Sequence, residues 1–273
     1  MTDKISLAGD LGSGKSTVSN ILIEKLSAEY YSTGAIVRKI AERHNMSVVE
    51  LNVYMETHPE IDTEIDNGLM ELSGLDKCLI IDSRMAWHFT KGTFKVYLSV
   101  DAETSAIRIM GANRVGEHSA TLEETIRDTK ARRESEKKRY KEQYGVDIKD
   151  LSNYSLIVDT SVATPTQVAE CILDSFEKWQ KDRDFSKVYI SFQRLNFPDD
   201  EPDAELIAHY SSMLELGESL PEISVIECDG EFYIDNGAEI AIAYSFGEDV
   251  FIPASLVKGD ISGKKYVRMK DSL

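Results

Sequence analysis

The sequence predicts an α/β protein of the P-loop type: a three-layer α/β/α fold with a parallel sheet, followed by a smaller C-terminal α+β domain. Three observations support this prediction. A glycine-rich segment at residues 9–16 lies between a short apolar run and an amphipathic stretch. Strand-like and helix-like patterns then alternate along residues 1–183, which is typical of a parallel sheet covered by helices on both faces. Beyond residue 183 the composition becomes more acidic, which indicates a second unit.

The predicted strands of the first unit are short runs of residues that favour buried β-structure. They are residues 5–8, 78–82, 94–100 and 156–159. The predicted helices between and after them are residues 17–26, 35–43, 48–56, 61–72, 102–110, 122–144 and 164–179. Thr164 is a good N-cap and Pro165 suits a first helical turn, whereas Thr33 is expected to cap the helix that follows it.

The C-terminal part is predicted to begin with an acidic, proline-containing linker at residues 184–205. The accessory α+β domain then covers residues 206–273, with a helix starting near residue 204. Strands at 223–227 and 231–234 flank the turn Asp229-Gly230, and a helix follows at 238–246. From residue 184 onward there are 18 acidic and 7 basic side chains, a net charge of −11 out of −17 for the whole chain.

This charge and the apolar pattern exclude several classes of function. A formal charge of −17 argues against broad nucleic-acid binding, which needs a basic surface. No apolar run approaches the roughly 20 residues that a membrane span requires. The first residues lack the features of a signal peptide, so we expect a cytoplasmic protein. The three cysteines form no metal-binding pattern. The acidic C-terminal domain is a candidate surface for a protein partner.

The segment Gly9-Asp10-Leu11-Gly12-Ser13-Gly14-Lys15-Ser16 fits the pattern G-x-x-x-x-G-K-[ST] between a strand and a helix. Backbone N–H groups of such a loop surround the phosphates of a nucleotide, and the helix dipole adds partial positive charge. Lys15 is expected to reach the β- and γ-phosphates, and the Ser16 hydroxyl to bind Mg²⁺. The predicted contacts of ATP in this region are Gly9, Gly12, Ser13, Gly14, Lys15, Ser16 and Thr17.

Two other places are candidates for binding a second anion. Ser32 and Thr33 lie at a predicted helix N-terminus, with Arg38 one turn into that helix. The alternative for Arg38 is a solvated helix face. Asp82-Ser83-Arg84 ends the second apolar strand, at the carboxyl end where ligands bind in such sheets. Asp82 is expected to hold Mg²⁺ through water and Arg84 to bind an acceptor phosphate; the alternative is a simple strand-ending turn.

A further set of charges lies on the long helix predicted at 122–144. Arg132, Glu136 and Arg139 share one helix face by their spacing. They form either a salt-bridged stripe exposed to solvent or an arginine pair that a carboxylate holds toward a transferring phosphate.

Together these pieces resemble the cytidylate kinase family of nucleoside monophosphate kinases, in its shorter archaeal-type branch, over residues 1–180. The resemblance rests on residues 9–16, 32–34 with Arg38, 58–66, 82–84, 108–109, 132–140, 144–148, 159–161 and 164–165. It implies a kinase that uses ATP and Mg²⁺, with acceptor-binding helices at about 33–74 and a lid at about 111–130 that closes over ATP. By resemblance, the catalytic residues are Lys15, Arg132 and Arg139. Arg108, Thr160 and Ser161 would lie near adenine, and the acceptor would contact Ser32, Thr33, Arg38, Asp62, Asp66 and Arg84.

The resemblance also bears on the choice of acceptor. Asp62 and Asp66 share a helix face, and their carboxylates can accept hydrogen bonds from an amine such as cytosine N4. The expected acceptor is therefore a pyrimidine nucleoside monophosphate, CMP or dCMP; the alternative for both aspartates is a charged outer face. The chain departs from the family at Ser83, where glycine is usual, and at Ser105, where arginine is frequent. Ser83 is expected to add a side chain beside the acceptor pocket.

The C-terminal part shows a more limited resemblance to the ParB-like fold, at residues 223–226, 229–237, 243–244 and 251–253. That family has histidines and an arginine where this chain has Ala238-Glu239-Ile240, so a degenerate module for partner binding or regulation is expected. Two alternatives to the pyrimidine monophosphate kinase stay open. One is a nucleotide-binding switch or interaction protein with a degenerate kinase domain. The other is a kinase for a different small acceptor.

Overall fold

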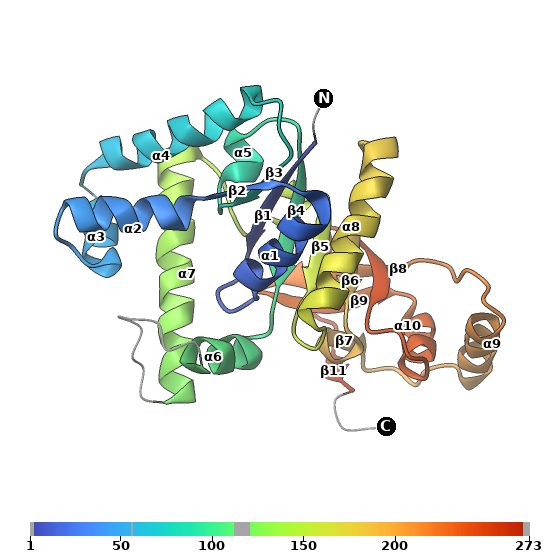
Figure 1. Cartoon of the computed structure of the whole chain (residues 1–273). Coiled ribbons are helices and arrows are strands. Elements are labelled where there is room, and N and C mark those ends of the chain that lie inside the picture. The colour runs from blue at the N-terminus through green and yellow to red at the C-terminus, as the bar shows by residue number, and fades with distance from the viewer. Residues whose placement is uncertain (1–2, 56, 112–120, 270–273) are drawn as a thin grey trace.

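A computed structural model describes residues 3–55, 57–111 and 121–269, with the side chains of 48, 49, 52, 132 and 135 left undescribed. The described strands join in one mixed sheet of the order β11-β7-β9-β8-β10-β6-β5-β4-β1-β3-β2 (Figure 1). The strands are β1 Lys4–Gly9, β2 Glu29–Ser32, β3 Leu79–Asp82, β4 Thr93–Ser99, β5 Leu156–Asp159, β6 Lys187–Ile190, β7 Leu195–Pro198, β8 Ile223–Cys228, β9 Glu231–Asn236, β10 Ile252–Leu256 and β11 Tyr266–Arg268.

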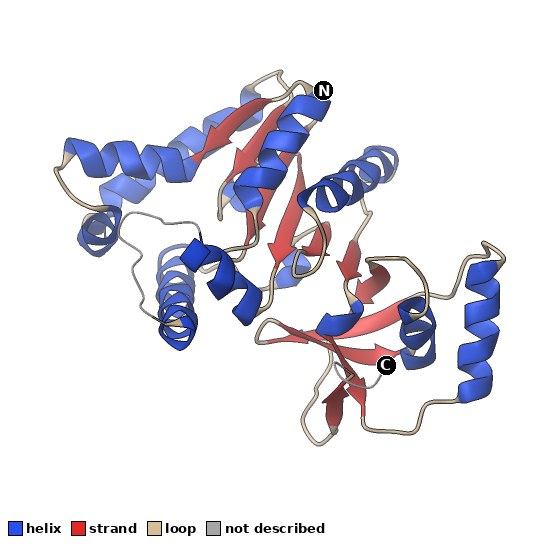
Figure 2. Cartoon of the chain, turned by 60° about the horizontal axis from the view of Figure 1, so that its bottom comes forward, coloured by secondary structure: helices blue, strands red, loops and turns tan. Residues whose placement is uncertain are grey.

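The α-helices alternate with these strands in the first two thirds of the chain, as predicted (Figure 2). They are α1 Lys15–Leu26, α2 Thr33–Arg43, α3 Val48–Met55, α4 Pro59–Glu71, α5 Ala86–Phe89, α6 Ala102–Gly111, α7 Leu122–Tyr144, α8 Pro165–Lys181, α9 Ala204–Glu215 and α10 Ala238–Ser245. No helix among the described residues is long and apolar enough to cross a lipid bilayer.

The strands from β2 to β6 form the parallel part of the sheet, in which every neighbouring pair runs in the same direction. Helices α1 and α8 cover one face. Val18 and Leu22 of α1 and Val168 and Ile172 of α8 are buried with side chains of β1, β4 and β5. The helix α8 starts with a capping box between Thr164 and Gln167, which confirms the predicted N-cap.

The acceptor-binding helices predicted at residues 33–74 appear as α2, α3 and α4, which lie beside the long helix α7 (Figure 1). They carry their own apolar cluster, including Ile40, Leu51 and Ile65.

Thr33 is the first residue of α2 and does not cap it. Ser32 has the N-cap position but makes no side-chain capping bond. Residues 112–120 of the predicted lid lie outside the described part of the chain.

The predicted linker at 184–205 is wrong, because two strands of the sheet lie in it. Strand β6 pairs with β5 in parallel and with β10 in antiparallel orientation, while β7 pairs with β9 and β11. The C-terminal strands thus continue the sheet of the first unit. The turn between β8 and β9 was predicted correctly: Asp229 and Gly230 both have positive φ, 53° and 85°, as a tight hairpin requires.

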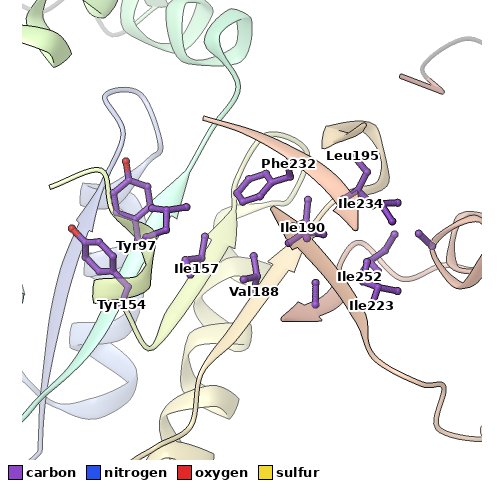
Figure 3. Close-up of a cluster of buried hydrophobic side chains, with 14 of the residues drawn as sticks. Tyr97, Tyr154, Ile157, Val188, Ile190, Leu195, Ile223, Phe232, Ile234 and Ile252 are labelled. Carbon is purple, nitrogen blue, oxygen red and sulfur yellow. The ribbon is translucent and has the colours of Figure 1, made fainter. Parts of the chain in front are cut away.

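A single apolar cluster extends across this junction (Figure 3). Tyr97 and Ile157, on β4 and β5, belong to the same buried set as side chains from the C-terminal strands. Those C-terminal members include Val188, Ile190, Leu195, Ile223, Phe232, Ile234 and Ile252. The buried apolar area shared by the two parts ties the C-terminal part to the fold of the first.

Candidate active site

The loop between β1 and α1 has the shape that its glycines allow. Gly9 and Gly12 have φ of 155° and 75°, and a Cβ at these positions would lie 2.5 Å from the Leu98 carbonyl oxygen and 2.7 Å from that of Ser105. Gly14 has φ of 80°, but its missing Cβ would meet nothing within 4 Å. Gly14 is also the N-cap of α1, and no side chain caps the helix there. The loop therefore leaves open space beside Gly14 at a helix N-terminus, where an anion binds favourably.

Lys15 lies over this loop. Its Nζ donates hydrogen bonds to the carbonyl oxygens of Gly9 and Asp10, at 3.0 and 2.9 Å. Burial lowers the pKa of Lys15 to about 8, although the nearby carboxylate of Asp82 acts in the opposite direction. An ammonium group that is already desolvated and bonded only to carbonyls is well placed to turn toward a phosphate.

The neighbours of Lys15 in the loop divide into exposed and buried side chains. Ser16 and Thr17 are exposed in the first turn of α1, as expected of residues that contact phosphate or Mg²⁺. Ser13 is buried, and its hydroxyl donates to the Asp10 carbonyl at 2.8 Å. Its side chain therefore supports the loop conformation, and only its backbone faces a ligand.

Asp10 is a residue of this site whose role the sequence analysis did not recognise. It is buried and accepts hydrogen bonds from Lys149, from the Tyr97 hydroxyl at 2.7 Å and from the Val100 amide at 3.2 Å. Burial alone would raise the pKa of Asp10, but Lys149 and then Arg133 lower it to about 2. A permanently ionised Asp10 thus fixes the P-loop to β4, α7 and the segment after α7.

Arg133 was also missed, because the helix-face argument selected Arg132. The Arg133 guanidinium lies 3.6 Å from Asp10, so Arg133 reaches the P-loop from α7. The side chain of Arg132 lies outside the described part of the structure, and its catalytic role stays a prediction. Adjacent positions of an α-helix lie about 100° apart around its axis, so the helix register was the signal in the sequence that could have indicated Arg133.

The segment that follows β3 also reaches this place. Arg84 forms an ion pair with Glu136 of α7 at 2.8 Å, and both line a small cavity together with Asp10 and Lys149. Arg84 and Glu136 also influence the pKa of Lys15, which places all three within one electrostatic cluster.

Ser83 does not project into the acceptor region as expected. It is buried, and its hydroxyl accepts a hydrogen bond from the Met85 amide at 3.3 Å.

Asp82 ends β3 beside β2 and β1. Its carboxylate accepts a hydrogen bond from Tyr30 at 3.0 Å, and the Thr33 hydroxyl donates to its carbonyl at 3.5 Å. The exposed Arg38 folds back along α2, since its Nη1 lies 3.7 Å from the Cβ position of Gly34. Ser32, Thr33, Arg38 and Asp82 are therefore grouped at the carboxyl ends of β2 and β3.

The two aspartates of α4 are not on an outer face. Asp62 and Asp66 are only 5% and 8% exposed and lie opposite the C-terminal half of α7. The Tyr144 hydroxyl donates a hydrogen bond to Asp66. Burial raises the pKa of Asp66 to about 6; the Tyr144 bond opposes this shift and the charge of Asp62 adds to it. Burial likewise raises the pKa of Asp62.

Arg139 belongs to this second group rather than to the P-loop. Its guanidinium donates to the Tyr140 hydroxyl at 3.4 Å. Burial would lower the pKa of Arg139, but Tyr140 and Asp62 raise it. The expectation that Arg139 reaches the phosphates stays a prediction. Arg139 provides the positive charge that faces the two aspartates.

The predicted adenine-side residues do come together. Arg108 of α6 donates to the Gly12 carbonyl at 3.3 Å and to the Thr160 carbonyl at 2.8 Å, which joins the P-loop to the turn after β5. The Thr160 side chain is buried, and its hydroxyl donates to the Ser99 carbonyl at 3.0 Å. Thr160 therefore supports the turn through its side chain, whereas Ser161 is partly exposed.

A glycine-rich loop between a strand and a helix, cations that reach it from α1, α6 and α7, and a helical insertion after the second strand are typical of a kinase of the P-loop class. Residues 4–162 match the model of a family described as the cytidylate kinase-like family. The chain belongs to this family and is a phosphotransferase.

Individual relatives agree with the family. A cytidylate kinase of Thermoplasma acidophilum is 34% identical over 183 residues, which are 65% of this chain and 94% of that protein. An S-adenosylmethionine-dependent nucleotide dehydratase of Lacinutrix mariniflava is 35% identical over 179 residues, but the match spans only 37% of that longer protein. A solved structure of an uncharacterized protein from Eubacterium ventriosum has a TM-score of 0.50 at 14% identity, over 64% of this chain and 99% of that one. The last likeness shows the fold alone.

Proposed function

We propose that this protein transfers the γ-phosphoryl group of ATP to a pyrimidine nucleoside monophosphate, CMP or dCMP, giving the diphosphate and ADP. The observation that carries the proposal is the burial of Asp62 and Asp66 inside the helical insertion, against Tyr144 and Arg139 of α7. Buried carboxylates need hydrogen-bond donors, and the exocyclic amine of cytosine is such a donor. The relatives named cytidylate kinase support the same acceptor.

The donor side fits ATP and Mg²⁺. The open space beside Gly14 and the uncapped start of α1 suit a polyphosphate, because a side chain or cap there would occupy the space. Ser16 and Asp82 are oxygen donors of the kind that Mg²⁺ prefers, and both lie by Lys15. When bound, Mg²⁺ would neutralise charge on the β- and γ-phosphates.

The remaining residues have roles that follow from their positions. Lys15 and Arg84 lie near each other and would both supply positive charge to the γ-phosphoryl group during transfer. Such preorganised charge stabilises an in-line transfer in which charge spreads over the phosphoryl oxygens. A phosphate acceptor is already anionic at neutral pH, so no general base is assigned. Arg38 and Ser32 would hold the acceptor on the α2 side.

A coupled assay of ADP release tests this proposal. The purified protein would be supplied with ATP, Mg²⁺ and, one at a time, CMP, dCMP, UMP, AMP and GMP, with Lys15→Met as the inactive control. We expect turnover with CMP or dCMP at a kcat/KM at least about tenfold above that with purine monophosphates.

Two results would replace the proposal by an alternative. ATP binding without turnover on any acceptor would favour a nucleotide-binding switch. Turnover restricted to a different small phosphate or hydroxyl acceptor would keep the phosphotransferase but overturn the assignment of Asp62 and Asp66 to a cytosine base.

A further inference from the structure

The turn that follows β5 is held from two sides through one buried carboxylate. One oxygen of Asp159 accepts hydrogen bonds from the amide and the hydroxyl of Ser161, at 3.2 and 2.6 Å. The other oxygen accepts the hydroxyl and the amide of Ser191, which follows β6 in the C-terminal part. Asp159 therefore links Ser161, a residue expected near adenine, to a residue outside the matched family region, which ends at 162.

Arg194 adds a second connection from the same C-terminal segment. It is 2% exposed, and its Nη2 donates to the Gly230 carbonyl at 2.7 Å and to the Ser99 hydroxyl at 3.4 Å. Its Nε lies 3.9 Å from Asp159. A buried guanidinium is costly unless it is paired, so this arginine constrains the position of its partners. Those partners are the end of β4, the end of β5 and the β8–β9 hairpin.

The same turn is connected to the P-loop through Arg108 of α6. Arg108 bridges the carbonyls of Thr160 and Gly12, and the Ser161 hydroxyl accepts a hydrogen bond from the Asp101 amide at 3.0 Å. A shift of the turn would therefore move both the adenine side of the site and the arginine that touches the loop. Hydrogen bonds to a carboxylate such as that of Asp159 are stronger than those between neutral groups, so they hold the turn firmly.

We propose that Ser191 and Arg194 are positioning residues for the nucleotide site: through Asp159 they fix the Thr160-Ser161 turn in the geometry that binds the adenosine part of ATP. This inference rests on the proposed function. It gives the C-terminal part a role in donor binding that is exerted through Asp159 and the Thr160-Ser161 turn. The acceptor side, which is formed by α2, α4 and α7, shares none of these bonds.

The test uses the full-length protein and the variant Ser191→Ala. We expect KM for ATP and the calorimetric Kd for ATP to rise about 3- to 10-fold, because the remaining Ser191 amide holds Asp159 more weakly. KM for the acceptor should change by less than about twofold. Arg194→Lys keeps the positive charge but loses the planar guanidinium group and its several donors. This variant should also raise KM for ATP. A general loss of stability would change KM for ATP and KM for the acceptor alike. A selective rise of KM for ATP therefore distinguishes a positioning role from destabilisation.

Ser224→Ala is the matched control, since the Ser224 hydroxyl also donates to an aspartate, Asp235, but on the exposed side of β8. It should leave both KM values unchanged. Equal ATP affinity of Ser191→Ala and the unmodified protein, or a parallel rise of both KM values, would overturn the inference while the proposed function stands. Failure of the unmodified protein to bind ATP in the calorimeter would overturn both.

Discussion

Arg84 and Glu136 form an ion pair of 2.8 Å that connects the end of β3 with the middle of α7. Neither residue is fully buried, so the pair itself adds little stability, on the order of 1 kcal/mol or less. Its consequence lies in orientation: the pair holds the Arg84 guanidinium near Lys15, where an acceptor phosphate would arrive.

We therefore expect Arg84→Met to raise KM for the acceptor about 10- to 100-fold, as befits the loss of a charge-assisted contact, with KM for ATP changed much less. Steady-state kinetics with each substrate varied in turn would measure this. Arg183→Met is the control, because Arg183 pairs with Asp3 away from the site. Equal effects on both substrates would argue against acceptor binding by Arg84.

The lowered pKa of Lys15 predicts a pH dependence of ATP binding. Lys15 titrates at about 8 in the free protein, and only its charged form attracts phosphate. The affinity for ATP should therefore be constant below about pH 7 and fall up to tenfold per pH unit above pH 8. Calorimetric titrations from pH 6 to 9.5 would show this profile. Lys15→Arg should bind with no decline in this range, and a decline of equal size there would exclude Lys15 as the titrating group.

Gly12 and Gly14 should respond differently to alanine. At Gly12 the new Cβ would lie 2.7 Å from a backbone oxygen, so the substitution should lower the free energy of unfolding by more than about 2 kcal/mol. At Gly14 there is space for the Cβ, and only the left-handed backbone is strained, at about 1–2 kcal/mol. Gly14→Ala should nevertheless weaken ATP binding strongly, because the methyl group would occupy the space that the phosphates of ATP are proposed to fill. Urea unfolding and ATP titration of both variants would reveal the contrast, and a milder unfolding effect at Gly12 would contradict it.

The raised pKa of Asp66 predicts how stability changes with pH. In the folded protein Asp66 binds a proton up to about pH 6, whereas in the unfolded chain it loses the proton near pH 4. Folding thus takes up a proton between these values, and the contribution of Asp66 to stability falls as pH rises from 4 to 6. The free energy of unfolding of the unmodified protein, compared with that of Asp66→Asn, should therefore fall between pH 4 and pH 6. Above pH 6 the difference between the two proteins should stay constant. Urea unfolding at pH 4, 5, 6 and 7.5 would test this; Tyr144→Phe should move the transition to higher pH.

The shared apolar cluster predicts that residues 1–183 do not fold alone. Removing the C-terminal part would expose Ile157 and the apolar side of β4 and β5, which are buried against β6 and its neighbours. We expect the shortened chain to lose its near-ultraviolet circular dichroism and its cooperative thermal transition. A sharp transition comparable with that of the full chain would instead show that the two parts are independent domains.

Much of the first unit could be predicted because its signals are local. Helix α7 was placed with its correct ends, since a capping residue and Gly145 mark them, and the P-loop motif identified β1 and α1 together. Strand β2 was missed because Glu29–Ser32 is short and only partly buried, which leaves no apolar run. Strands β6 and β7 were missed because acidic and proline residues nearby outweighed their alternating apolar residues.

The parts of the site that belong to sequence motifs, such as the P-loop, could be predicted. Long-range pairs such as Asp10 with Lys149, or Asp66 with Tyr144, depend on how α7 packs against the sheet. No spacing in the sequence encodes these contacts, so a single sequence cannot reveal them.

The continuous order of strands has a consequence for self-association. A parallel sheet that stopped at β5 would present a row of unpaired backbone groups, a template on which another chain could add a strand. Here the outermost positions fall to β2 and β11, which are 4 and 3 residues long and include Glu29 and Arg268. Because the C-terminal part extends the sheet from β5 to the short strand β11, we expect it to reduce the tendency of the molecule to pair with strands of another chain.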